Sequence, residues 1–527
     1  MRAARKKSLV SLIGFMIVCC FYTLAYSKTP EIIKVGLESV YKNVASVNLS
    51  SDSNMQIGYY DENGFELEGV LNANQITVRL NKENLYDLGV VFDNFNEAKQ
   101  YAINHGNGAV PVYIKSSTYA VYTTNDEGGL SRGQSFKRSI AIYNNLGELL
   151  LVSNEDERPL VMRGYDAATN LSLTTVKNNK KYRGAIGMGG TSGLTPYNIV
   201  DIEEYLFGVV PKEMPSSWPE EALKAQAVAA RSIAIFQYNR FINSGYNVID
   251  TTTTQVYGGY LAETAATNKA VNETKGQVIR YNGNVAEAVY FSTSGGTTED
   301  AKNVWGSDVA YLKSVKDTYE TEPSQKPWTR TITLSEINKC LANNGANIGS
   351  AKGVQIVSRT SSGRVQELNI LGTSGTYTVK DEKIRSFFSS SDGGSLKSRL
   401  FSFSGEINNN TVATGPVTNE VTVISANGKG TLPSKNLMVM TATNMGILAN
   451  EFTVQSATRL SNLTTTSMPV QEVVSNNQET VWGDITIYGQ GFGHGVGMSQ
   501  SGAKGMAQAG FSYDQILKYY YTGVSVN

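Results

Sequence analysis

The chain has 527 residues, of which 41% are hydrophobic and 17% charged, so it is long enough for about three globular domains with a substantial core. Its 46 basic and 46 acidic residues balance; without residues 1–27, which hold four basic side chains and no acidic one, 42 basic residues face 46 acidic ones, a net charge of −4. Because nucleic-acid-binding proteins carry a basic surface, no nucleic-acid partner is expected.

Residues 1–27 have the pattern of a secretory signal. A basic start precedes an apolar run, Leu9–Phe21, and a small-x-small cleavage site, Ala25–Ser27. We expect export, with the mature chain beginning near Lys28 and acting outside the cell, at the wall or the outer face of the cytoplasmic membrane. Retention of the segment is the alternative, although its apolar run is short for a membrane span.

Residues 28–127 predict a small α+β domain. A strand at Ile76–Leu80 and a helix at Phe95–Ile103 precede a hairpin formed by Val110–Ile114 and Tyr119–Tyr122. This order resembles the sporulation-related repeat domains, which bind glycan strands stripped of peptide. The resemblance rests on pattern more than on motif, so it assigns no binding residues, and a plain α+β extension is the alternative.

From Ser139 the pattern turns to strands, and then to helices around one glutamate. The expected strands are Ile140–Tyr143, Leu149–Ser153, Leu160–Arg163 and Lys181–Ile186. A short helix, Asp201–Phe207, with Asp201 as its cap, then leads to Glu213. An alanine-rich helix from about Glu220 to Ser244 follows, with Gly245 as its stop.

Glu213 is the strongest candidate for chemistry in the chain. It is expected in a loop, between Pro211 and Pro215 and among apolar neighbours, where desolvation would favour its protonated form. That environment suits a general acid. A purely local capping or pairing role is the alternative.

The C-terminal half predicts a second α/β alternation and a glycine-rich closing block. A helix is expected at Ser335–Leu341, strands at Val354–Ser358, Val365–Leu371 and Thr376–Val379, and paired strands at Val421–Ile424 and Leu437–Met440. The block Tyr488–Gln500 contains alternating glycines and His494, and helices are expected at Ser501–Gln508 and Tyr513–Tyr521. The glycine spacing does not fit a dinucleotide or phosphate loop.

Several of these segments together resemble the stage II sporulation protein D and amidase-enhancer family. They are Tyr182–Gly184, Asp201–Leu206, Gly208–Pro215, Glu221–Arg231, Asp250–Gly259, Tyr290–Glu299, Val304–Gly306, Tyr311–Val315 and the closing block. The resemblance implies an α+β catalytic domain formed by residues 139–407 and 481–527. A β-rich insertion of unassigned role, residues 408–480, splits this domain.

The sequence lacks the residues that a zinc hydrolase or a serine hydrolase needs. A zinc site needs about three ligands, and the chain has two histidines, His105 and His494, no His-Glu-x-x-His, and none of the Cys and His through which some relatives bind metal near Phe291. Neither Ser294 nor Ser499 lies in a Gly-x-Ser-x-Gly pattern. No cofactor and no metal is expected.

The family resemblance implies a lytic transglycosylase that cuts peptidoglycan strands stripped of stem peptides. Most glycosidases use two carboxylates. When the C6 hydroxyl of N-acetylmuramic acid attacks its own C1, one carboxyl group can serve as acid and then as base, and Glu213 fits that role.

Five further residues are candidate substrate contacts, each with a plainer alternative. The resemblance implicates Arg231, Tyr311 and Lys313, and His494 and Gln500 are candidate sugar contacts. Arg231 in a buried helix would need a partner of its own, Tyr311 could be core packing, Lys313 a solvated charge and His494 a turn residue.

A second function class stays open. The chain could be a non-catalytic wall protein that stimulates an N-acetylmuramoyl-L-alanine amidase, as the amidase-enhancer branch is named for. An apolar surrounding for Glu213 favours the enzyme. The sequence does not distinguish a sporulation role from a vegetative one. It also identifies no particular amidase partner and no oligomeric state.

Overall fold

The structure, a computed structural model, describes residues 30–61, 64–320, 327–404 and 479–527, together with six short strands between 420 and 464. The predicted signal lies outside these residues. The chain divides into two compact units. The first contains the chain up to Glu213, Ala230–Glu287 and Val524–Asn527, and the second contains Met214–Ala229 and Ala288–Gly523.

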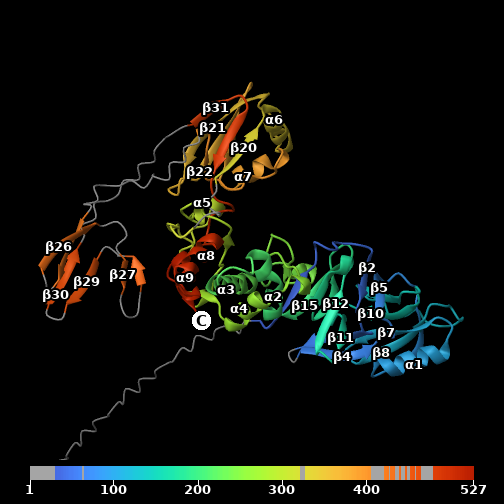
Figure 1. Cartoon of the computed structure of the whole chain (residues 1–527). Helices are drawn as coiled ribbons and strands as arrows, with labels where there is room; N and C mark the ends of the chain where they lie inside the picture. The colour runs from blue at the N-terminus through green and yellow to red at the C-terminus, as the bar shows by residue number, and fades with distance from the viewer. Residues whose placement is uncertain are drawn as a thin grey trace, which may run out of the picture. The chain divides into compact units, whose positions relative to one another are not determined.

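The first unit is built on one large mixed sheet, which carries α1 against β7 and β8 (Figure 1). In spatial order its strands are β16 (Val248–Ile249), β1 (Ile32–Gly36), β15 (Thr195–Asp201), β14 (Ala185–Gly189), β11 (Val161–Asp166), β12 (Leu171–Thr175), β2 (Ser46–Ser50), β5 (Gln75–Leu80), β9 (Ser139–Asn144), β10 (Leu149–Asn154), β7 (Ala109–Lys115), β8 (Thr118–Thr123) and β6 (Tyr86–Phe92). Off this path, β13 (Lys181–Arg183) pairs with β12, and β3 (Met55–Asp61) pairs with β11 and β4 (Gly64–Val70).

The helices of this unit are α1 (Phe95–His105), α2 (Ile202–Glu213), the second half of α3 (Glu220–Phe236) and α4 (Ala265–Glu273). Short 3-10 turns lie at Lys177–Asn179, Ile242–Ser244 and Tyr260–Ala262. A small sheet joins β18 (Asn284–Val285), β17 (Ile279–Tyr281) and β34 (Ser525–Val526).

The sheet of the first unit crosses the predicted domain limits. β1 pairs antiparallel with β15 and parallel with β16, and β10 pairs parallel with β7. The strand, helix and hairpin predicted within residues 28–127 are confirmed as β5, α1, β7 and β8, but they belong to a sheet that continues beyond residue 127. The likeness to sporulation-related repeats therefore stays a prediction.

The second unit contains several smaller sheets, and α6 and α7 lie beside the β21–β22 pair (Figure 1). The sheets are β20 (Trp328–Ile332), β32 (Ile485–Gly489) and β24 (Phe401–Ser402); β23 (Thr376–Lys380), β22 (Val365–Gly372), β21 (Ala351–Arg359) and β31 (Glu479–Trp482); and the parallel pair β19 (Tyr290–Phe291) and β33 (Met498–Ser499). Its helices are the first half of α3, α5 (Lys302–Trp305), α6 (Leu334–Asn343), α7 (Lys383–Phe387), α8 (Gln500–Gln508) and α9 (Tyr513–Tyr520), with a 3-10 turn at Phe388–Ser390.

Within residues 408–480 the structure describes three hairpins. They are β25 (Glu420–Ser425) with β26 (Gly428–Pro433), β27 (Met438–Met440) with β28 (Met445–Ile447), and β29 (Glu451–Ser456) with β30 (Arg459–Thr464). The predicted pairing of Val421–Ile424 with Leu437–Met440 is wrong, because each of these strands pairs with the strand that directly follows it.

Both units mix helices with mainly antiparallel strands, which agrees with the α+β class predicted. Cys340, on α6, is a buried free thiol. Of the helices in the described part of the chain, none is both long and apolar enough to cross a bilayer.

Candidate functional site

Glu213 is the last residue of helix α2, not a loop residue as the sequence predicted. The helix begins after Asp201, whose Oδ1 accepts from the backbone N of Glu203 at 2.8 Å and of Glu204 at 3.3 Å, as the cap prediction required. It then continues past Pro211 for two more residues, and the side chain of Glu213 is half-buried.

The continuation of α2 through Pro211 is stabilised by the segment around Tyr257. Proline cannot donate to the carbonyl one turn earlier, which usually weakens a helix at this point. Here the neighbouring carbonyl of Gly208 accepts from the backbone N of Gly258 at 2.9 Å. Gly208 also lets the Tyr257 ring approach, because a Cβ would lie 2.5 Å from its Cε2.

Tyr205 connects this packing to the candidate acid. Its ring lies 5.0 Å from that of Tyr257, and its hydroxyl donates to Oε1 of Gln255 at 3.2 Å. Burial raises the pKa of Tyr205 well above its ordinary value, and the charges of Glu213 and Asp250 raise it further. Tyr205 is thus a neutral, fixed side chain within electrostatic reach of Glu213.

Arg231 lies inside the first unit, paired with Glu203 of α2. Nε donates to Oε1 of Glu203 at 2.9 Å and Nη2 to Oε2 at 2.5 Å. The remaining contacts reach the backbone oxygens of Gln277 at 3.0 Å and Val271 at 3.3 Å. With 1% of its surface exposed, Arg231 joins α3 to α2 and to the end of α4.

Tyr311 and Lys313 lie in the second unit, on either side of buried Leu312, and both are partly exposed. The backbone oxygen of Tyr311 accepts from the N of Thr522 at 3.1 Å. Lys313 forms an ion pair with Asp308, and this hydrogen bond raises the pKa of the lysine above its ordinary value. Lys313 is therefore a fully charged ammonium group at a partly open surface.

His494 is held as a neutral ring. Its Nδ1 accepts from the backbone N of Val496 at 3.1 Å, and its Nε2 lies 3.1 Å from the backbone oxygen of Tyr290, to which it can donate. The rings of Phe291 and Trp305 lie 5.5 and 5.2 Å away. Burial, with nearby arginines adding to it, lowers the pKa of His494 to about 4.

Gln500 opens helix α8 and is largely buried. Its Nε2 donates to Oε1 of Gln226 on α3 at 3.2 Å. Ser499 caps the same helix by accepting from the backbone N of Gly502 at 3.1 Å. The amide of Gln500 thus connects two helices of the second unit.

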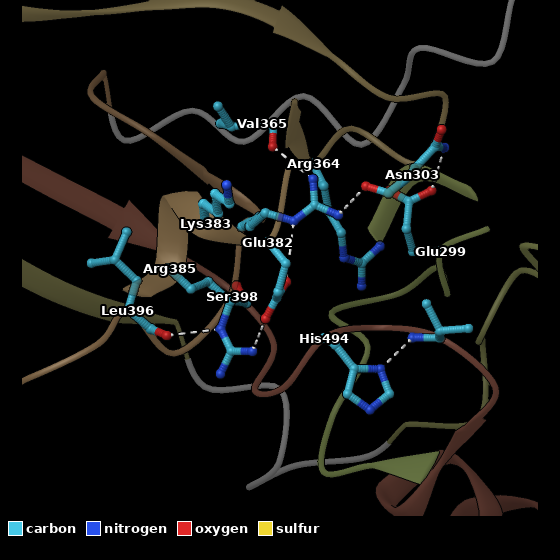
Figure 2. Close-up of polar contacts among 12 residues, drawn as sticks. Glu299, Asn303, Arg364, Val365, Glu382, Lys383, Arg385, Leu396, Ser398 and His494 are labelled. Atoms are coloured by element: carbon cyan, nitrogen blue, oxygen red, sulfur yellow. Dashed lines mark hydrogen bonds and ion pairs between the residues drawn. The ribbon is translucent and has the colours of Figure 1, made fainter. Parts of the chain in front are cut away.

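A buried network of charged side chains, which the sequence did not predict, lies beside His494 of the closing block, Tyr488–Gln500 (Figure 2). Oε1 of Glu299 accepts from Nδ2 of Asn303 at 2.9 Å, and its Oε2 accepts from the hydroxyls of Thr360 at 2.6 Å and Ser362 at 2.7 Å. The backbone N of Glu299 donates to the oxygen of Gly495 at 2.8 Å. Glu299 therefore fixes the residue next to His494.

Two buried arginines complete this network. Arg364 donates to the backbone oxygens of Thr297 and Ser294, each at 2.8 Å, and Arg399 donates to those of Val365 and Asn303, each at 2.9 Å. Desolvation lowers the pKa of Arg364 to about 10, which leaves it charged at neutral pH. Glu299 lies in a segment that carries the family resemblance, but its partners Thr360 and Ser362 lie some sixty residues away, and no local pattern predicts them.

The six predicted site residues are thus divided between the units. Glu213 and Arg231 belong to the first, where Glu203 on α2 connects them, and Tyr311, Lys313, His494 and Gln500 belong to the second. No group of three His, Cys, Asp or Glu side chains within the described ranges could hold a metal ion. The six predicted site residues together supply one carboxyl group, an amide, a phenol, an imidazole and two cationic groups.

These features define a class: a mixed α/β protein with a half-buried glutamate at the end of a proline-containing helix and a glycine-rich block near its C-terminus. The model of the family described as stage II sporulation protein matches residues 190–281. A model described as a domain of unknown function matches residues 307–430.

Curated relatives agree with the first of these matches. The amidase enhancer of Bacillus subtilis (strain 168) is 35% identical over 334 residues, which is 61% of this chain and 40% of that protein. An uncharacterized protein of Brachyspira hyodysenteriae is 30% identical over 330 residues, 62% of this chain and 67% of that protein. Stage II sporulation protein D of Bacillus subtilis (strain 168) is 29% identical over 343 residues, 62% of this chain and 75% of that protein. The chain belongs to the stage II sporulation protein D and amidase-enhancer family.

Proposed function

We propose that this protein is a peptidoglycan lytic transglycosylase, exported to the cell wall, that cleaves glycan strands stripped of their stem peptides. The observation that carries the proposal is the position of Glu213, a half-buried residue at the end of α2, in a chain that belongs to this family.

The reaction needs only this one carboxyl group. Protonated Glu213 gives its proton to the glycosidic oxygen between C1 of N-acetylmuramic acid and the next sugar, and that bond breaks. The C6 hydroxyl of the same sugar then bonds to C1, and its proton passes to the Glu213 carboxylate. A 1,6-anhydro ring forms, the acid is regenerated and no water is consumed.

The surrounding residues support this role by holding helix α2, which ends at Glu213. The ion pair between Arg231 and Glu203 fixes α2, and the contacts of Tyr257 and Gly258 fix the turn that contains Pro211. A general acid must lie within hydrogen-bonding reach of the oxygen it protonates, so a rigid helix end favours catalysis.

Water labelled with oxygen-18 tests the reaction type. Incubation of peptide-free glycan with the mature chain is expected to give anhydro products that contain no label and lack the elements of water relative to a hydrolysis product. Incorporation of label at the new reducing end would identify a hydrolase and contradict the proposal.

A second candidate, stimulation of an amidase, is favoured by one observation: a relative that is 35% identical is named amidase enhancer. Glu213→Gln separates the two. If the chain acts only by stimulating an amidase, this variant will increase release of stem peptides by a purified wall amidase as much as the unaltered chain does. Deletion of residues 28–127 is a poorer test, because it would remove strands from the middle of the large sheet.

A further inference from the structure

Arg163, on β11, lies against two aromatic rings in the first unit. Its guanidinium carbon lies 3.7 Å from the centre of the Phe65 ring and 4.8 Å from that of Tyr165. Tyr60 adds a third ring, 5.7 Å from Phe65 and nearly perpendicular to it at 76°. A cation over aromatic faces is attracted to both, and the rings in turn hold its planar group in one orientation.

The strand register explains why these side chains meet. Arg163 on β11 lies opposite Gln56 on β3, and Tyr60 on β3 lies opposite Phe65 on β4. Residues 56, 58 and 60 share one face of β3, since side chains alternate along a strand. Gly58 leaves the space for the aromatic ring, because a Cβ there would lie 2.6 Å from Cζ of Phe65.

Arg163 also has no carboxylate partner among the residues that the structure describes. Its Nε donates to the neutral Oε1 of Gln56 at 2.9 Å, and no protein acceptor is found in those ranges for its two Nη groups. Arg183, in contrast, pairs with Glu263 at 2.6 Å. The nearby Asp166 accepts from its own turn, at Ala168 and Thr169.

An arginine of this kind is unusual at a partly buried position. Partial burial lowers the pKa of Arg163 from its ordinary value, so this cation loses hydration at a place where the described residues supply no carboxylate to pair with it. Among the described residues the two Nη groups of Arg163 have no protein acceptor, and together they match a carboxylate, because Arg and carboxylate pair through two hydrogen bonds.

We propose that the Arg163 site binds a carboxylated sugar, namely the lactyl carboxylate of a peptide-free N-acetylmuramic acid residue. The identity of this ligand rests on the proposed function. Removal of the stem peptide converts the lactyl amide into a carboxylate, which the two Nη groups of Arg163 can bind through two hydrogen bonds. Recognition of this carboxylate selects stripped strands over strands that still carry peptide.

The site is separate from Glu213 but lies in the same unit. Tyr60 packs against the buried cluster that contains Tyr197 and Ile199 on β15, the strand that leads into α2. Burial raises the pKa of Tyr60 to about 12, with smaller contributions from Glu204 and Asp201 at the start of α2. Helix α2 has 12 residues, or about 18 Å at 1.5 Å per residue, and Glu213 is at its other end. A glycan strand of several sugars is long enough to reach both places.

The test measures binding in the Glu213→Gln background, where no cleavage interferes. The ligands are peptide-free peptidoglycan oligosaccharides, the same oligosaccharides with the lactyl carboxylate reduced to an alcohol, and N-acetylglucosamine oligomers of equal length. We expect Arg163→Met to weaken binding of the acidic glycan about 10-fold or more, as loss of a charged hydrogen-bonded pair does, and to leave the other two ligands unchanged.

Two controls separate this role from a loss of folding. Arg158→Met removes an arginine stacked 4.6 Å from Tyr59, a residue on the opposite face of β3 from Tyr60, and should change no ligand's affinity. Reduction of the ligand carboxylate tests the same contact with Arg163 intact, so the experiment does not depend on the variant folding.

If the chain with Arg163 intact binds the acidic and the reduced glycan with equal affinity, the inference is overturned. The outcomes also separate it from the proposed function. A chain that prefers the acidic glycan but forms no anhydro product refutes transglycosylase activity alone, whereas anhydro formation with no carboxylate preference refutes the Arg163 site alone.

Discussion

Nε and Nη2 of Arg231 reach both carboxylate oxygens of Glu203, at 2.9 and 2.5 Å, and both side chains are nearly inaccessible to solvent. Oε1 of Glu203 also accepts from the backbone N of Gly276 at 3.0 Å. This pair joins α2, the helix that ends at Glu213, to α3 and to the turn after α4. The pair therefore contributes to the position of the helix that ends at Glu213.

Removal of one partner of this pair should destabilise the first unit strongly. Arg231→Met leaves Glu203 buried without its cation, and breaking a buried ion pair in this way costs about 3–5 kcal/mol. Urea unfolding followed by far-ultraviolet circular dichroism measures the loss. Glu203→Gln combined with Arg231→Met should cost less than the two single changes added together; strict additivity would show that the pair does not act as a unit.

His494 should stay neutral across the physiological range and make stability depend on pH. Its pKa is lowered to about 4, below the ordinary value of 6.5, so the unfolded chain takes up a proton first as the pH falls. Stability should therefore decline from about pH 6.5 to about pH 4, by at most about 1.4 kcal/mol per pH unit. Nuclear magnetic resonance titration of the histidine signals measures this pKa. The variant His105→Gln assigns them, since His105 and His494 are the only histidines; a midpoint near 6.5 for His494 would refute the prediction.

Asp317 should show the opposite dependence. Burial, reinforced by the charge of Glu320, raises its pKa to about 7. Tyr520 donates to Oδ1 of Asp317 at 3.0 Å, and Ser499 donates to Oε1 of Glu320 at 2.6 Å, so both carboxyl groups are fixed inside the second unit. The folded chain holds a proton that the unfolded chain has lost above about pH 4, so this contribution to stability is present at low pH and disappears as the pH rises through 7.

The variant Asp317→Asn tests that dependence. It keeps the shape of the side chain and removes the ionisation, so the stability difference between pH 5 and pH 8, measured by thermal unfolding, should become smaller than in the unaltered chain. An unchanged difference would assign the pH dependence to other groups.

Gly495 should tolerate alanine less well than Gly510, although both have a φ of 90°. A Cβ at Gly495 would lie 2.8 Å from Nε of the buried Arg364, whereas nothing lies within 4 Å of one at Gly510. Gly510→Ala should cost about 1–2 kcal/mol from backbone strain alone, and Gly495→Ala about 3 kcal/mol or more, because Arg364 cannot move away. Chemical denaturation compares the two; equal losses would show that Arg364 adapts.

Local sequence patterns predicted helices and strands well where neighbouring residues, such as helix caps and turn residues, determine their limits. The strand, helix and hairpin around Phe95–His105 and the helix at Leu334–Asn343, which has a capping box formed by Thr333 and Glu336, are found close to their predicted limits. The predicted strand Lys181–Ile186 is interrupted at Gly184, whose φ is 69° and where a Cβ would lie 2.2 Å from the oxygen of Ile199.

Long-range contacts decided the rest. The sequence placed Glu213 in a loop because Pro211 normally ends a helix, but the packing of Tyr257 and Gly258 against Gly208 allows α2 to continue. The alanine-rich helix ends at Phe236, earlier than predicted, and Gly245 instead closes a separate 3-10 turn. The partner of Arg231 was not predictable, since Glu203 lies in another helix and spacing alone does not bring the two together.

The measurement that tests the central claim most directly is mass spectrometry of amidase-stripped glycan after incubation with the mature chain, with Glu213→Gln and with Glu220→Gln. The last variant is a matched control, because it makes the same change at an exposed glutamate at the start of α3. The account predicts anhydro-muramyl products from the unaltered chain and from Glu220→Gln, and none from Glu213→Gln. Anhydro products from a folded Glu213→Gln chain, or no products from any of the three although the glycan binds, would contradict it.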